Sequence, residues 1–214
     1  MLKLLFTFTV MLVLHGCVTQ ELHSDVVLPQ NFKAQTISIK PDIFIVNEPF
    51  VQTPGELWGS SIGGLVGAAI AAGATSEEQY VALLKQNKIN LKEIAREAFK
   101  SQLLKSGSSL KLVSNKADIE VQLQILFYGI HPAGPFSDSV EPMLEVGANV
   151  FVNNGQHYMD ISESIKFPDD ELITPVLMEE YVENPELLKN AYMTLAETIS
   201  ETIIQQLSML GTSH

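Results

Sequence analysis

The stretch 117–129, "ADIEVQLQILFYG", decides the fold, because its side chains alternate between apolar and polar. The apolar positions are Ile119, Val121, Leu123, Ile125 and Phe127, and Glu120, Gln122 and Gln124 lie between them. Alternation with a period of two is typical of a β-strand with one face against a core and one toward water. The stretch therefore predicts a strand in a sheet that has a single dry face.

Two further strands are predicted downstream of this one. A loop at 131–142 leads to "MLEVGANVFV" (143–152), in which the even-numbered residues are apolar, and "QHYMDISESIKF" (156–167) alternates again. Between them, "NNG" (153–155) is a turn signal. We expect the three strands to form an antiparallel meander.

The segment between residues 76 and 107 predicts two helices that precede the meander. The first starts at a capping box, "SEEQ" (76–79), and runs to residue 86. The second is capped by Asn90, with Glu93 three positions later, and ends at Gly107. Its apolar residues form one stripe: Leu91, Ile94, Ala95, Ala98, Phe99 and Leu103.

The closing helix is the longest predicted element. Asn184 is its expected cap, Pro185 takes the first helical position, and Gly211 ends the run. An apolar stripe suited to lying across a sheet is made by Leu188, Ala191, Tyr192, Leu195, Ile199, Ile203 and Leu207.

Before the helices, "AQTISIKPDIFIV" (34–46) offers two β-rich runs separated by Pro41. The complete predicted order is β-α-α-β-β-β-α. This order predicts an α+β fold, with helices packed on one face of a mainly antiparallel sheet. We expect residues 35–210 to form a single domain.

Residues 1–16, "MLKLLFTFTVMLVLHG", have the layout of a secretory signal peptide. Lys3 precedes an apolar run that ends at a small residue, Gly16. A helix over the eleven residues 4–14 would be about 16 Å long, against about 30 Å of hydrocarbon in a bilayer. The segment therefore favours a cleaved signal over a membrane-spanning helix.

The next residue, Cys17, is the only cysteine of the chain. "LHGC" (14–17) resembles the lipobox of bacterial lipoproteins, with His15 where that family usually has Ala, Ser or Thr. The resemblance implies cleavage before Cys17 and lipidation of its sulfur, so that residues 17–34 become a lipidated tether. Val18 stands where an Asp retains enteric lipoproteins at the inner membrane, which favours the outer membrane and a domain that faces the periplasm.

A Gly/Ala-rich segment, "LWGSSIGGLVGAAIAAGAT" (57–75), follows the first strands. Gly59, Gly63, Gly67 and Ala71 recur every four residues, which in a helix would leave one face open to close backbone approach. Three interpretations remain open: packing of this helical segment within the domain, association between copies as a glycine zipper, and insertion into a bilayer.

The chain of 214 residues has a net charge of −12, which argues against nucleic acid and anionic membrane surfaces as partners. The charge is uneven, because residues 118–214 hold two cations, Lys166 and Lys189, against sixteen acids. Either an acidic, solvated surface or a steering face for a basic partner fits this pattern.

No catalytic, metal or cofactor motif is present in the sequence, and we predict none. His131 and His157 lack zinc-ligand spacing and are expected to be structural. A hydrolase that uses His131, His157 and Asp170 is an alternative that the sequence leaves open. "PDDE" (168–171) lacks the spacing of a calcium loop.

A second resemblance covers residues 35–208. The helix at 90–104, the strand "KADIEVQLQ" (116–124), the turn at 153–155 and the closing helix at 187–207 resemble the small α/β domain of certain envelope lipoproteins. These are relatives of the curli secretion channel component, the N-terminal domain of the Tol-system beta-propeller protein, and lipoprotein activators of cell-wall synthases. Fold likeness alone does not transfer a function.

Together these features predict a non-catalytic, lipid-anchored envelope protein that acts as a protein-binding accessory or scaffold. Its expected partners are the membrane, through Cys17, and one or more envelope proteins. The alternative is a self-assembling secretion or channel subunit, a homo-oligomer built through the segment 57–75.

Overall fold

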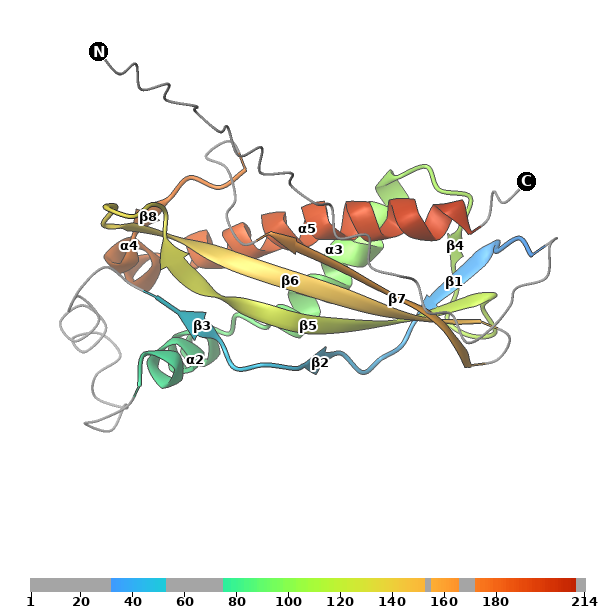
Figure 1. Cartoon of the computed structure of the whole chain (residues 1–214), viewed down its shortest axis with the longest axis horizontal. Helices are drawn as coiled ribbons and strands as arrows, with labels where there is room; N and C mark the ends of the chain where they lie inside the picture. Colours follow the sequence, from blue (N-terminus) through green and yellow to red (C-terminus); the bar gives the residue numbers. More distant parts are fainter. Residues whose placement is uncertain (1–31, 53–74, 153–154, 166–171, 211–214) are drawn as a thin grey trace, which may run out of the picture.

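The computed structural model describes residues 32–52, 75–152, 155–165 and 172–210. Two long strands, β5 (Ile119–Pro132) and β6 (Ser139–Val152), form the centre of an eight-stranded sheet (Figure 1). The other described elements are β1 (Thr36–Ile39), β2 (Phe44–Ile45), β3 (Phe50–Val51), α2 (Ser76–Gln86), α3 (Leu91–Lys105), β4 (Lys111–Leu112), β7 (Gln156–Ile165), β8 (Val176–Leu177), α4 (Met178–Glu183) and α5 (Pro185–Met209).

The strand order is β4-β1-β5-β6-β7, and the long strands pair as predicted. β5, β6 and β7 form an antiparallel meander, in which Ile119 lies opposite Val152 and Val150 lies opposite Met159. β1, β2 and β3 each pair with β5 in parallel, so the segment 36–51 runs along β5 as an interrupted edge. The predicted α+β class, with a mainly antiparallel sheet, is confirmed.

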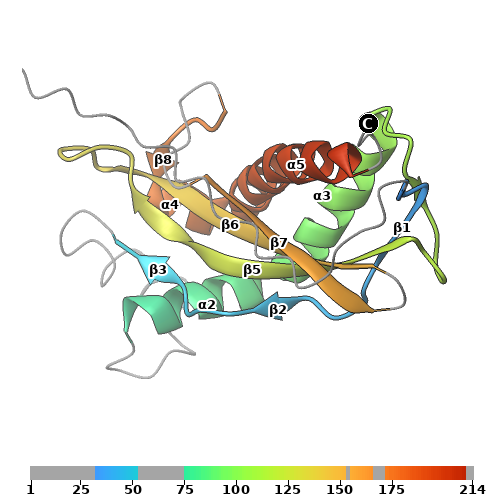
Figure 2. The ribbon, with the colours of Figure 1, turned by 45° about the vertical axis from the view of Figure 1, so that its right-hand side comes forward.

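Helices α3 and α5 lie side by side on one face of the sheet (Figures 1 and 2). The whole predicted stripe of each helix is buried. Apart from Ala95, these side chains join the odd-numbered residues 119–125 of β5 and the even-numbered residues 144–152 of β6 in one hydrophobic cluster. The apolar patterns of α3, α5 and β6 therefore located the core correctly.

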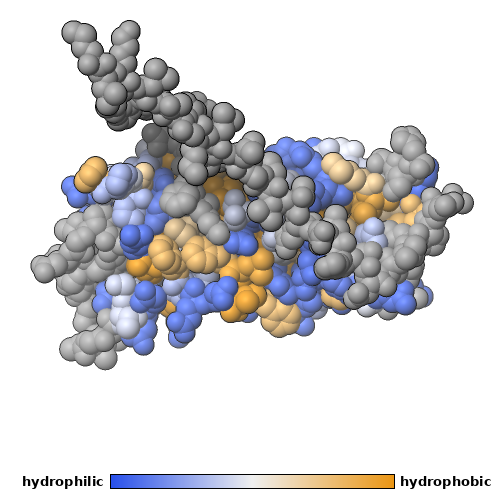
Figure 3. All heavy atoms as spheres, in the orientation of Figure 1, coloured by the Kyte–Doolittle hydropathy of each residue, from blue (hydrophilic) through white to orange (hydrophobic). Residues whose placement is uncertain are grey.

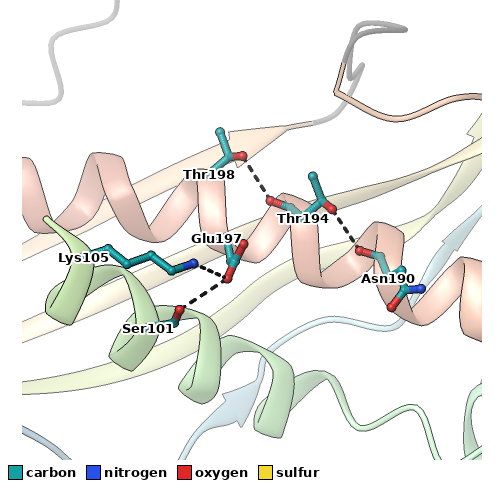
Figure 4. Close-up of polar contacts among 6 residues, drawn as sticks. All are labelled: Ser101, Lys105, Asn190, Thr194, Glu197 and Thr198. Carbon is teal, nitrogen blue, oxygen red and sulfur yellow. Dashed lines mark hydrogen bonds and ion pairs between the residues drawn. The ribbon is translucent and has the colours of Figure 1, made fainter.

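Polar contacts at the rim of the helix pair connect α3 to α5 (Figure 4). Lys105 Nζ lies 3.3 Å from Glu197 Oε1, and the hydroxyl of Ser101 donates to the same carboxylate oxygen at 3.4 Å. On α5, Thr194 and Thr198 each donate to the carbonyl four residues earlier. Because Lys105 and Glu197 are partly exposed, their ion pair contributes little stability, about 0–1 kcal/mol.

α2 is joined to the helix layer by a buried pair of tyrosines. Tyr80 and Tyr192 place their hydroxyl oxygens 2.6 Å apart, and Tyr192 donates to the carbonyl of Gly129 at 2.8 Å. Since the single hydroxyl proton of Tyr192 is used in this bond, Tyr80 is the donor between the two rings. Burial raises the pKa of both hydroxyls, so both stay protonated at neutral pH.

The alternation of the deciding stretch breaks at Leu126, where β5 bulges. Phe127 was expected on the dry face, but the bulge turns it to the opposite face, and Tyr128 and Ile130 continue the core instead. The side chain of Leu126 lies over Gly147 of β6, where a Cβ would come within 2.9 Å of it. Glycine at this position therefore leaves the space that the bulged side chain occupies.

Two element boundaries and one helix cap differ from the predictions. The expected loop at 131–142 is shorter, because β5 continues to Pro132 and Pro142 pairs with Ile130 inside the hairpin. α2 is capped by Thr75 rather than Ser76, since Glu78 completes a reciprocal box with the Thr75 backbone. α5 begins at Pro185 as predicted, but the Asn184 side chain makes no capping bond.

One carboxylate fastens β1 to the start of β5. Asp118 accepts hydrogen bonds from the backbone N–H groups of Gln35 and Thr36 and from the Thr36 hydroxyl, each at 2.9 Å. The Gln35 bond, followed by the Thr36 bonds, lowers the pKa of the Asp118 carboxyl. A carboxyl with a lowered folded-state pKa stabilises the fold above its unfolded pKa, and this stabilisation is lost as the pH falls through the folded value.

Asp118→Asn is therefore expected to lower the free energy of unfolding by about 1 kcal/mol at pH 7, because the charge-assisted bonds become neutral. The difference from the wild-type chain should shrink below about pH 4, as the wild-type carboxyl protonates. Urea unfolding at pH 7 and pH 3 measures both effects. Asp138→Asn, the same change at an exposed residue of the hairpin loop, is the matched control, and an equal loss in both variants would contradict the prediction.

Candidate functional site

Most of the site residues that the sequence singles out lie outside the described residues, and only His131 and His157 lie within them. Those outside are Cys17, Gly59, Gly63, Gly67 and Ala71, and Asp170 of the hydrolase alternative. The interpretations of the segments 14–17 and 57–75 stay predictions. Within the described ranges, no helix is both long enough and apolar enough to cross a bilayer.

His131 lies at the end of β5, opposite Glu141 of β6, and both side chains are buried. Its Nε2 is 3.4 Å from Glu141 Oε1, and its Nδ1 donates to the carbonyl of Pro132 at 2.7 Å. Burial, together with the nearby charge of Glu141, raises the pKa of the Tyr181 hydroxyl. His131 and Glu141 therefore form a buried polar contact between β5 and β6.

Regular alternation over 156–167 predicts that His157 lies on the same strand face as Met159 and Ile161, and this prediction is wrong. A register shift in β7 places His157 opposite Phe151 and Met159 opposite Val150, so the two residues face opposite ways. His157 Nε2 lies 2.8 Å from Asp160 Oδ1 on the outer face. In the described part of the chain, no three His, Cys, Asp or Glu residues form a metal-binding group.

Exposed apolar side chains gather instead along the interrupted edge strand. Phe44, Val46 and Phe50 are 49%, 55% and 41% exposed, and the Phe50 ring lies 5.7 Å from that of Phe127 between centroids. Figure 3 shows hydrophobic surface over the region of β2 and β5. We call Phe44, Val46 and Phe50 the edge strip. Among the described strands, β2 and β3 pair only with β5, so the strip borders an open sheet edge.

A hollow of about 470 Å³ lies on the helix side of the same edge. It is bounded by β2, β5, the C-terminal end of α2 and the first turn of α3. Its apolar lining consists of Ile45, Val81, Leu84, Ile89, Leu91 and Tyr128, and its polar lining of Lys85, Lys88, Asn90, Lys92 and Glu93. We call it the lysine-rimmed pocket.

Alternation in β2 explains why the strip and the pocket are separate. Successive strand residues point to opposite faces, so Ile45 faces the helices and the pocket, whereas Phe44 and Val46 face away. Tyr128 of β5 also lines the pocket. Burial, followed by the charge of Glu48, raises the pKa of Tyr128, so its hydroxyl stays protonated at neutral pH.

Sequence reasoning missed both features, although one signal was present. "FIV" (44–46) is a run of three apolar residues in a strand with a single dry face, so at least one of them had to face solvent. The lysines gave no such signal, because residues 85, 88 and 92 come together only through the turn between α2 and α3.

No protein-family model matches the sequence, and no curated protein matches it. Several solved structures have a similar arrangement. One is a protein from Xanthomonas campestris, with 12% identity and a TM-score of 0.41, over 85% of this chain and 87% of that chain. Another is a hypothetical protein from Chlamydia trachomatis, with 11% identity and a TM-score of 0.41, over 86% and 100% of the two chains.

A third is a minor lipoprotein from Acinetobacter baumannii, with 10% identity and a TM-score of 0.32, over 82% of this chain and 94% of that chain. The structures that this chain resembles therefore include a bacterial lipoprotein. At these identities and TM-scores, the likenesses carry no argument about the function of the chain.

Proposed function

We propose that this chain is a non-catalytic, lipid-anchored protein of the bacterial outer membrane that binds a partner protein through the edge strip. The lipobox resemblance at 14–17 supports the anchor. Exposure of Phe44, Val46 and Phe50 supports the binding role and is the observation that carries the proposal. A single exposed apolar side chain is ordinary on a protein surface, but neighbouring ones on one edge are typical of interaction sites.

The open edge adds a geometric reason for protein binding. β2 and β3 are two residues each, and both use β5 as their strand partner. A partner that covers the strip removes the exposed half of three apolar side chains from water, which is worth about half of the roughly 1.5–3 kcal/mol gained when such a side chain is buried from full exposure. The anchor confines the chain to one membrane surface, so the partner is expected in the envelope.

Photo-crosslinking in living cells tests this proposal. A photoreactive amino acid at position 44 is expected to give one discrete adduct with another envelope protein, and the double substitution Val46→Ser with Phe50→Ser should lower its yield at least about tenfold. The control position is Leu104, which is 78% exposed on α3, away from the strip. Leu104 should give no such adduct.

Two outcomes would contradict the proposal. Equal adducts at positions 44 and 104, or none at position 44, would mean that the strip is not a binding surface. An adduct between two copies of this chain would support the self-assembling alternative instead, and the mass of the crosslinked product separates the two cases.

A further inference from the structure

The lysine-rimmed pocket combines an apolar floor with a positively charged mouth. Its floor is apolar, since Leu84, Ile89 and Leu91 line it at 6% exposure or less. Its volume of about 470 Å³ falls in the range of about 300–1,000 Å³ that is usual for small-molecule sites. At its mouth, Ile45 and Val81 leave apolar surface in water, at 40% and 43% exposure.

The charge at the mouth is positive although the chain carries −12 overall. Three exposed lysines, Lys85, Lys88 and Lys92, line the pocket against one carboxylate, Glu93. Among the ion pairs found in the described residues, none involves these three lysines. Their charges are therefore available to an anionic ligand.

Lys88 takes the left-handed position that ends α2, where the Ile89 N–H donates to the Leu84 carbonyl at 2.8 Å. Lys88 has a φ of 55°, directly after the C-cap residue of α2. This left-handed conformation is most easily adopted by glycine, which is the commonest residue at that position after a helix. A lysine in place of glycine here keeps a positive charge in the lining of the pocket.

We propose that the lysine-rimmed pocket binds an anionic single-chain amphiphile, a free fatty acid, with the acyl chain on the apolar floor and the carboxylate at the lysines. The hydroxyl of Tyr128, also in the lining, is a further donor available to a ligand. An acidic amphipathic helix would satisfy the same charges, but it needs an extended hydrophobic groove, whereas the apolar lining here is a single hollow of about 470 Å³ bounded by β2, β5, α2 and α3. The proposal does not depend on the edge strip or on its protein partner.

A photoactivatable fatty acid tests the proposal on the complete chain in isolated membranes. We expect light-dependent adducts on peptides that contain Ile45, Val81 or Leu91, removed by excess palmitate. Light dependence separates them from acyl groups attached at Cys17. Replacing Lys85, Lys88 and Lys92 by Gln should lower the labelling at least about fivefold, and Val81→Trp, which fills the mouth at an exposed position, should abolish it.

The matched control replaces Lys100, Lys105 and Lys111 by Gln, since these lysines lie outside the pocket lining; it should keep wild-type labelling. Lys88→Gly gives a second, separate measurement: it relieves the left-handed backbone, so thermal stability should rise while labelling falls. Labelling spread evenly along the chain, equal labelling by the uncharged fatty alcohol, or a Lys88→Gly variant that binds as well as the wild type would each overturn the proposal. If the fatty acid does not label the pocket but crosslinking at position 44 still gives the adduct, only the fatty-acid proposal is overturned and the proposed protein-binding function stands.

Discussion

Replacing Cys17 by serine is expected to move the protein from the membrane fraction to the soluble fraction. Acyl chains hold a protein to a bilayer by about 0.8 kcal/mol for each buried methylene, and one chain binds only marginally. The two or three chains implied by the lipobox resemblance would make the attachment effectively permanent, and a serine oxygen at position 17 receives none of them. The expected change is therefore close to complete.

Cleavage before position 17 is itself expected to depend on the cysteine, so the Cys17→Ser variant must obtain its mature N-terminus in another way. It is expressed behind a secretory signal that is cut independently of residue 17, and fractions are compared after washing with high salt. Val18→Ser behind the native signal is the control and should stay in the membrane fraction. Mass spectrometry of the native protein provides a further check. An uncleaved signal peptide or an unmodified thiol at Cys17 would contradict the prediction of a lipid anchor.

The helices and the meander could be predicted because their information is local and periodic. Every stripe residue predicted for α3, from Leu91 to Leu103, is buried, and the even-numbered residues 144–152 face the core as expected. A long element repeats its apolar period several times, so one exception does not change the result.

For two strands, the sequence did not predict which face every side chain takes. A bulge reverses the alternation within a strand without any change in its composition. Leu126 shifts the register of β5, so Phe127 leaves the core face; the shift in β7 does the same to His157. Both depend on how the strand fits its partner, as where the Leu126 side chain fills the space above Gly147, and that information is not local.

The edge strip and the lysine-rimmed pocket show the same limit for function. β2 and β3 are too short for a period, and their place beside β5 depends on pairs more than 75 residues apart in the chain, such as Phe44 with Gln124 and Phe50 with Gly129. The sequence indicated apolar residues at 44–46 but not their exposure. It indicated the lysines but not their common pocket.

The variant Gly129→Ala is expected to destabilise the fold strongly, because Gly129 of β5 lies directly against the backbone of Phe50 in β3. A Cβ at position 129 would lie 1.8 Å from the Phe50 carbonyl oxygen and 2.7 Å from the carbonyl carbon. Backbone atoms cannot move aside as a side chain can, so β3 must leave β5. The same residue accepts the Tyr192 hydrogen bond, so the tyrosine link between α2, α5 and β5 is disturbed as well. We expect a loss of about 3 kcal/mol or more in the free energy of unfolding.

Gly134→Ala is the matched control, because the new Cβ would meet only the Ser137 Cβ, at an ordinary 3.9 Å. Urea unfolding of the two variants should differ by at least about 2 kcal/mol. Limited proteolysis should then cut Gly129→Ala within residues 44–52 under conditions in which Gly134→Ala resists. If the two variants unfold at the same urea concentration, β3 does not press on β5. In that case Phe50 is not held in the edge strip, and the surface proposed for the partner protein loses one of its three side chains.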